Sequence, residues 1–221
     1  MPSLWMLVRA SGTVDIVLLT VTVALGVSTI GSGAVGGAPR FFIRHIHRDA
    51  SLLAVALLIA HVVAAVMLLH LDLIPSVVPF ASHTRRLYLG LGVLGADLMV
   101  AVAVTSMVRM RLGLRRWRWL HLTAYLAWGA AIVHGAAPGT DVGVPWVADL
   151  DIACVLVVVA CAIVRLLQLQ RHQPLRLLMG GAVAALALIG FVTWVHTGPS
   201  TTAPSSGPTA PALAQLDVTE N

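Results

Sequence analysis

Long apolar runs are the feature that most restricts the fold of this chain. They extend for roughly 17 to 25 residues, and about 20 helical residues cross a hydrocarbon core of about 30 Å. Only 10% of the 221 residues are charged and 58% are hydrophobic, whereas about 25% of a soluble domain is charged. Backbone groups inside a bilayer must be satisfied within the protein, so such runs form helices. The sequence therefore predicts an all-α membrane protein, a six-transmembrane-helix bundle.

The expected spans divide the chain into a transmembrane domain and a tail. The spans lie at about residues 13–30, 47–71, 88–108, 117–136, 150–169 and 177–195. We expect residues 1–196 to form the transmembrane domain. Residues 197–221 are rich in Pro, Ser, Thr and Ala, and we expect them to be a disordered tail.

Two local features have simple interpretations. Arg9 precedes the first apolar run as in a signal peptide, but Asp15 interrupts that run, so we expect a retained helix. Cys154 and Cys161 are seven residues apart in one apolar run, which separates their Cα atoms by roughly 10 Å, beyond disulfide reach. We interpret both cysteines as small packing residues.

The distribution of arginines predicts the orientation. All 14 basic side chains are arginines, and most follow spans one, three and five, whereas the opposite side carries Asp141 and Asp149. The positive-inside rule then places both termini outside. We expect a multi-pass protein of the plasma (inner) membrane, surrounded by membrane lipid. Nucleic acid is not an expected partner, because no soluble basic face is apparent.

Four histidines are paired on two of the expected spans. His47 and His61 are 14 residues apart on span two, and His121 and His134 are 13 apart on span four. Both spans run in the same direction, so the histidines form two levels separated by roughly 20 Å. Each level offers one imidazole from each side, as a six-coordinate haem b requires. The spacing predicts two stacked haems, with the iron as the metal at both levels.

The spacing also raises a geometric difficulty on span four. Fourteen residues fall only about 40° short of four helical turns, but thirteen leave an ideal helix about 140° out of phase. Span four therefore requires a tilt or a local irregularity, and Gly129 is a candidate position.

The remaining histidines are interpreted as interfacial or hydrogen-bonded residues. They are His45, His70, His83, His172 and His196. Ionisable residues within apolar spans are costly and usually functional, which distinguishes His61 and His134 from this group. His45 is a rival to His47, but its distance of 16 residues from His61 fits the second level less well.

Other polar residues have more than one interpretation. Candidate partners for the propionates of an inner haem are Arg44, Arg48, Arg115 and Arg118, with Arg85 and Arg86 for an outer one. Arginine suits carboxylates through its paired donors, but these arginines can equally serve only to set the topology. Asp97, in the middle of span three, can orient a ligand histidine, serve a proton or quinol site, or make a structural hydrogen bond.

The histidine pattern resembles the ferric reductase-like transmembrane superfamily. This superfamily includes the membrane portions of ferric reductases and NADPH oxidases and the haem-binding subunit of periplasmic methionine sulfoxide reductase. The resemblance covers about residues 40–170. It rests on His47–Arg48, His61, the Trp-Leu-His-Leu-Thr-Ala-Tyr segment at 119–125, His134–Gly135 and the Gly-Thr-Asp segment at 139–141. It implies b haems held by His47/His121 and His61/His134, and electron flow from the cytoplasmic to the outer side.

The departures from the superfamily shape the functional expectation. No glycine-rich dinucleotide fingerprint follows a strand, so we expect an oxidoreductase membrane subunit without its own flavin or NAD(P)H domain and without a catalytic side chain. A quinol or a cytosolic reductase would donate electrons. The outer acceptor would be a flavoprotein, a molybdoenzyme, ferric iron or dioxygen. The alternatives are a divalent-metal or proton transporter that uses the same histidines, and a non-catalytic scaffold.

Overall fold

The computed structural model describes residues 2–28, 40–70, 72–82, 86–136, 145–169 and 190. Regular structure in these ranges is helical throughout, without a strand. The helices are α1 (Pro2–Ser28), α2 (Arg40–Leu69), α3 (Leu73–Val77), α4 (Arg86–Met107), α5 (Arg109–Leu112), α6 (Leu114–His121), α7 (Thr123–Gly135) and α8 (Pro145–Leu169). The predicted all-α class is confirmed. The sixth expected span, except for residue 190, and the tail lie outside the described residues.

Four of these helices are long and apolar enough to cross a membrane. Their candidate spans are Leu4–Val27, Phe41–Leu68, Arg86–Met107 and Trp146–Val164. Three helices begin five or more residues before the expected spans: α1 at Pro2, α2 at Arg40 and α8 at Pro145. Hydropathy marks only the apolar part of a helix, whereas backbone hydrogen bonds continue into the polar flanks, so these N-terminal boundaries were predicted too late.

The fourth expected span is not one helix but two, because α6 ends at His121 and α7 begins at Thr123. The N–H of Tyr125 donates to the carbonyl of Leu122 at 3.2 Å, a three-residue bond typical of a 3₁₀ turn. The predicted irregularity therefore lies at Leu122, beside a histidine. Gly129, the candidate position from the sequence, lies inside the continuous helix α7.

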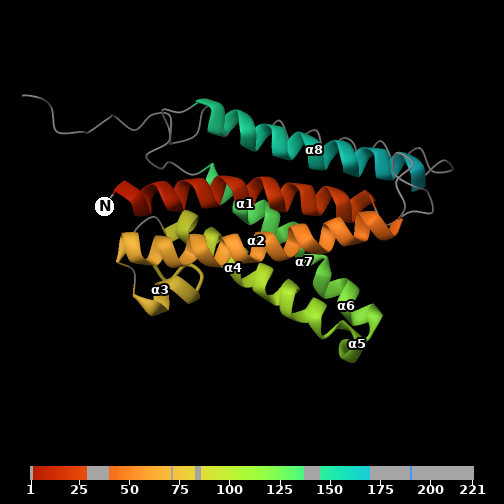
Figure 1. The fold of residues 1–221 in the computed structure, drawn as a ribbon, viewed down its shortest axis with the longest axis horizontal. Coiled ribbons are helices and arrows are strands. Elements are labelled where there is room, and N and C mark those ends of the chain that lie inside the picture. Colours follow the sequence, from red (N-terminus) through yellow and green to blue (C-terminus); the bar gives the residue numbers. More distant parts are fainter. Residues whose placement is uncertain are drawn as a thin grey trace, which may run out of the picture.

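Helices α1, α2, α4 and α7 form a four-helix bundle. Around the bundle, α1 packs against α2, α2 against α4, α4 against α7, and α7 against α1. Helices α2 and α7 therefore lie across the bundle from each other, the position from which side chains reach a shared core. Helix α8 packs on α1, and Figure 1 shows α1 between α8 and α2.

The centre of the bundle is a small apolar layer. It consists of one residue from each helix: Leu19, Ala54, Met99 and Ala127. The two alanines are completely buried, so α2 and α7 contribute little volume there. Small residues at this level let the four helices approach closely.

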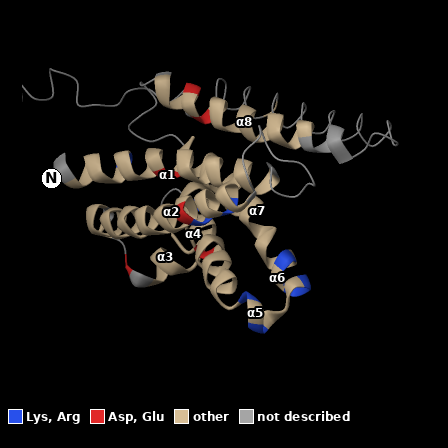
Figure 2. Ribbon diagram, turned by 45° about the vertical axis from the view of Figure 1, so that its right-hand side comes forward, with Lys and Arg blue, Asp and Glu red and all other residues tan. Residues whose placement is uncertain are grey.

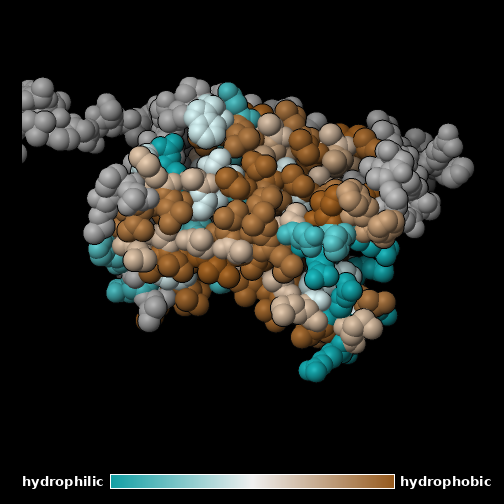
Figure 3. Space-filling view, viewed as in Figure 1, coloured by the Kyte–Doolittle hydropathy of each residue, from teal (hydrophilic) through white to brown (hydrophobic). Residues whose placement is uncertain are grey.

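The outer surface along the long helices is largely apolar, as Figure 3 shows. Many large hydrophobic side chains are exposed there, including Leu52, Ile59 and Val104. Soluble monomers rarely expose contiguous apolar surface of this extent, and lipid is the environment that it fits. Positive charges gather at α5 and α6 (Figure 2). The chain is a membrane protein with several apolar helices.

Candidate functional site

The four histidines singled out in the sequence form two facing pairs inside the bundle. The ring centroids of His47 and His121 are 6.2 Å apart, with an angle of 70° between the ring planes. Those of His61 and His134 are 6.4 Å apart, at 86°. In each pair one ring comes from α2 and the other from the α6–α7 segment. The two pairs therefore occupy two levels along the same two elements.

The separation of the rings fits one iron between each pair. An imidazole nitrogen binds a metal at about 2.0–2.1 Å, so two imidazoles on opposite sides of one iron place their ring centroids roughly 6 Å apart. Within the described residues, no group of three or more His, Cys, Asp and Glu side chains is placed to hold a metal ion. Two opposed imidazoles fit the share of the ligands that a protein contributes to a six-coordinate haem, in which the porphyrin supplies the other four nitrogens.

Three of the four imidazoles are oriented by a backbone carbonyl on a neighbouring helix. The Nδ1 atoms of His47, His61 and His134 lie 3.0, 3.0 and 2.8 Å from the carbonyl oxygens of Thr22, Val8 and Tyr88, respectively. A carbonyl only accepts, so Nδ1 carries the proton and Nε2 keeps its lone pair. Such a bond on the far nitrogen fixes the tautomer and ring orientation of a metal-binding histidine.

A glycine stands beside each of these three rings. The pairs are Gly12 with His61, Gly26 with His47 and Gly92 with His134. A Cβ atom at Gly12 would lie 2.9 Å from the His61 ring, and one at Gly92 would lie 2.7 Å from the His134 ring. At Gly26 the ring of His47 would be 3.5 Å away, an ordinary contact. Each glycine follows the accepting carbonyl by four residues, so the missing side chain leaves that carbonyl open to the imidazole.

Along each of three helices, one step of seven residues leads from a histidine level to the central apolar layer, and a second step leads to the other histidine level. On α1 the sequence of layers is Gly12, Leu19 and Gly26; on α2 it is His61, Ala54 and His47. On α4 it is Gly92, Met99 and Ser106. The bundle thus places two polar, glycine-lined levels on either side of one packed apolar layer.

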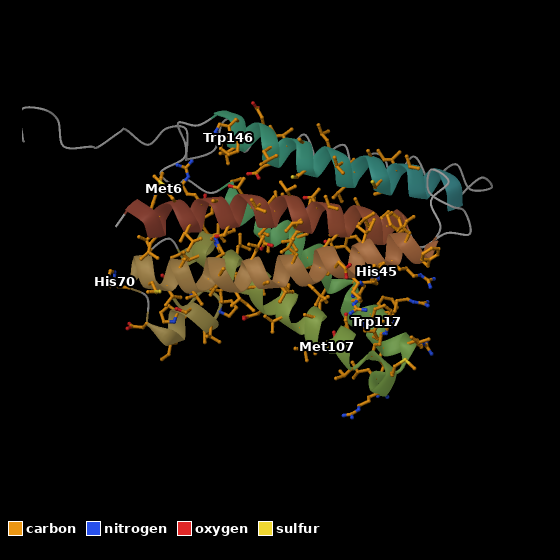
Figure 4. The ribbon with its side chains drawn as sticks, viewed as in Figure 1. Met6, His45, His70, Met107, Trp117 and Trp146 are labelled. Carbon is orange, nitrogen blue, oxygen red and sulfur yellow. The ribbon has the colours of Figure 1, made fainter. Side chains whose placement is uncertain are left out.

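The other histidines do not join these pairs. His45, the rival to His47, is on the surface of α2, where its Nε2 lies 3.6 Å from Asp49. His70 is exposed at the far end of α2, and Figure 4 shows it at the opposite end of the bundle from His45 and Trp117. His83, His172 and His196 lie outside the described residues.

The predicted arginines share one end of the bundle with the His47/His121 pair. Arg44 and Arg48 are exposed on α2, and Arg115 and Arg118 are exposed on α6. At the other end, Arg86 donates through Nε to the carbonyl of Phe80 at 2.9 Å. Arg85 lies outside the described residues.

The carboxylates differ from the expectation in one respect. Asp97 is exposed on α4, and the acceptors that orient three of the histidines are backbone carbonyls instead. Among the described residues, the buried carboxylates are Asp15 on α1 and Asp151 on α8, only 5% and 2% exposed. Sequence reasoning missed their burial, although an acidic residue within an apolar run is itself the signal.

The glycines beside the histidines were also missed. Gly12 and Gly26 are 14 residues apart, the spacing of His47 and His61. That match between two neighbouring antiparallel helices was visible in the sequence, but a glycine pair is common in membrane helices and points to no ligand by itself.

The comparison with protein families agrees with this architecture. Residues 11–132 match the family described as "Ferric reductase like transmembrane component", which is more than half of the chain. The match begins on α1, earlier than the range of about 40–170 over which the sequence resemblance was seen, and includes the helix that carries Gly12 and Gly26. No curated protein and no solved structure matches the chain. The chain belongs to the family of ferric reductase-like transmembrane components.

Proposed function

We propose that this protein carries electrons across the membrane on two b haems. His47 and His121 would hold one haem, and His61 and His134 would hold the other. The observation that carries the proposal is the pair of ring-centroid distances, 6.2 and 6.4 Å. Membership of the ferric reductase-like family supports a transmembrane electron-transfer role.

The residues of this chain bind the cofactor and set its surroundings. Bound haem supplies a one-electron iron couple whose potential depends on its ligands, hydrogen bonds and burial. The carbonyls of Val8, Thr22 and Tyr88 hold three imidazoles with Nε2 directed away from the neighbouring helix. The apolar layer around Leu19 and Met99 separates the two levels.

The charged ends of the bundle support a direction for the electrons. The arginine-rich end with α5 and α6 is the cytoplasmic side under the positive-inside rule, in the plasma (inner) membrane. Arg44, Arg48, Arg115 and Arg118 are exposed near the His47/His121 pair, where they can bind propionates through paired N–H donors. Electrons would enter from a quinol or a cytosolic reductase at this pair. They would leave at the His61/His134 pair to a flavoprotein, a molybdoenzyme, ferric iron or dioxygen.

The ligand sets favour this proposal over a metal transporter. Divalent transition metals in proteins are usually held by three or four side chains, but each level here offers two opposed imidazoles. A scaffold would not require imidazoles whose Nδ1 atoms are bonded to a neighbouring helix. The carbonyl bonds to His47, His61 and His134 are the arrangement that a metal-binding imidazole uses.

Replacement of single histidines tests the proposal. We expect the purified chain to carry two b haems, and His61→Ala or His134→Ala to lose one of them, because one imidazole cannot hold a six-coordinate haem. The pyridine haemochrome assay measures the haem content per chain. His45→Ala is the matched control, since this exposed histidine lies two residues from His47. Unchanged haem content in both His61→Ala and His134→Ala contradicts the proposal.

A further inference from the structure

The two histidine pairs are not equivalent, and the difference lies at His121. Its Nδ1 atom is buried, and no hydrogen-bond partner for it lies within the described residues. The Nδ1 atoms of the other three imidazoles all meet a carbonyl oxygen. The ring of His121 is instead stacked on Trp117, with centroids 4.8 Å apart and 28° between the planes.

The register of α4 explains why no carbonyl accepts a hydrogen bond from His121 in the described part of the chain. Two seven-residue steps from Gly92 through Met99 lead to Ser106, so a serine stands at the position where the other three histidines have a glycine. The acceptor that corresponds to Tyr88 is the carbonyl of Val102, four residues before Ser106. The Cβ atom of a serine covers a carbonyl that a glycine leaves open.

Two further bonds occupy this corner of the bundle. The hydroxyl of Thr105 donates to the carbonyl of Ala101 at 2.7 Å and to that of Val102 at 3.2 Å. Trp117 donates through Nε1 to Ser106 Oγ at 3.2 Å. The tryptophan that stacks on His121 is therefore anchored to the serine that replaces the glycine.

The backbone at His121 is also less constrained than that at His47. His121 is the last residue of the eight-residue helix α6, in which no residue is buried. His47 lies inside the 30-residue helix α2. A ligand without an outer hydrogen bond typically loses 10- to 100-fold in metal affinity.

We propose that His121 is the histidine that a bound haem would release most readily, and that the iron position freed in this way would bind neutral diatomic molecules of the carbon monoxide class. The exchange breaks the bond from His121 Nε2 to iron and forms one bond from the diatomic molecule, with no change in electron count. His47, held by the carbonyl of Thr22, remains bound on the other side. This inference rests on the proposed function.

The reaction of the reduced protein with carbon monoxide tests this proposal. We expect the half of the haem at the His47/His121 pair to react in a fast phase, and the other half to react at least tenfold more slowly or not at all, because only one of the two sites has a weakly held ligand. The double variant Thr105→Ala/Ser106→Gly opens the Val102 carbonyl to His121, so its fast phase slows at least tenfold. Ser106→Ala keeps the Cβ atom and is the control, whose fast phase does not slow.

A second variant assigns the fast phase independently. Trp117→Leu removes the ring that stacks on His121, so it speeds the fast phase and leaves the slow phase unchanged, whereas Trp117→Phe keeps a stacking partner. A single phase that includes all of the bound haem overturns the inference, as does a fast phase whose rate is the same in the double variant, in Trp117→Leu and in the unmodified protein. If haem is bound but the sites react alike, the proposed function stands and only this inference fails. A purified chain without b haem overturns both.

Discussion

At the scale of residues, the contacts between helices are few and specific. Trp128 on α7 donates through Nε1 to the hydroxyl of Thr20 on α1 at 3.0 Å, and this hydroxyl in turn donates to the carbonyl of Ile16 at 2.8 Å. A hydrogen bond of this kind contributes about 1 kcal/mol to stability. The contact links the helix that carries His134 to the helix whose carbonyls orient His47 and His61.

Trp128→Phe should therefore destabilise the protein by about 1 kcal/mol, since it removes the donor and part of a packed ring. Thermal unfolding in detergent measures the change. Trp119→Phe is the control, because Trp119 is 70% exposed, and it should unfold like the unmodified protein. Equal losses in both variants would show that the bond from Trp128 to Thr20 contributes nothing.

At the scale of elements, glycines decide how closely an imidazole approaches the neighbouring helix. We expect haem content and haem affinity to decrease most in Gly92→Ala, less in Gly12→Ala and least in Gly26→Ala. The reason is that the added Cβ atom would lie 2.7, 2.9 and 3.5 Å, respectively, from the imidazole ring. Displacing the ring from its carbonyl costs about 10- to 100-fold in affinity. Haem titration of the apoprotein gives the affinities.

Gly129→Ala is the matched control for this series. Nothing lies within 4 Å of a Cβ atom there, so the variant should keep its haem and gain up to about 1 kcal/mol of helix stability. An order in which Gly26→Ala is the worst variant would refute the role of close approach.

At the scale of the whole molecule, the two ends differ in charge, and this difference should fix the orientation. We expect a cysteine at Met110 on α5 to react with an impermeant maleimide only after the cells are opened, because arginine-rich ends stay in the cytoplasm. A cysteine at Ile74 on α3 should react in intact cells. Both positions are exposed, at 82% and 69%, and Cys154→Ala/Cys161→Ala provides the background. The reverse labelling pattern would invert the proposed direction of electron flow.

Much of the fold was predictable because lipid imposes simple rules on sequence. Apolar runs predicted helices, and four candidate spans are present in the described residues. The resemblance based on His47, His61 and the segment at 119–125 is confirmed by the family match. The break at Leu122 was expected only as an irregularity somewhere in span four. The spacing of His121 and His134 shows that span four must deviate from an ideal helix, but it does not give the position of the deviation.

The sequence by itself determined the helical class, the family and the two histidine spacings, because these depend on local composition and on counting along a helix. Only the tertiary structure decided which carbonyl each imidazole meets, since that depends on the register between α1, α2, α4 and α7. It placed glycines beside three rings and Ser106 at the level of the fourth. It also left the Nδ1 atom of His121 without an acceptor in the described part of the chain. The two histidine pairs therefore differ in the hydrogen bonding of their imidazoles because of how the helices pack, and the sequence of one helix alone does not reveal this difference.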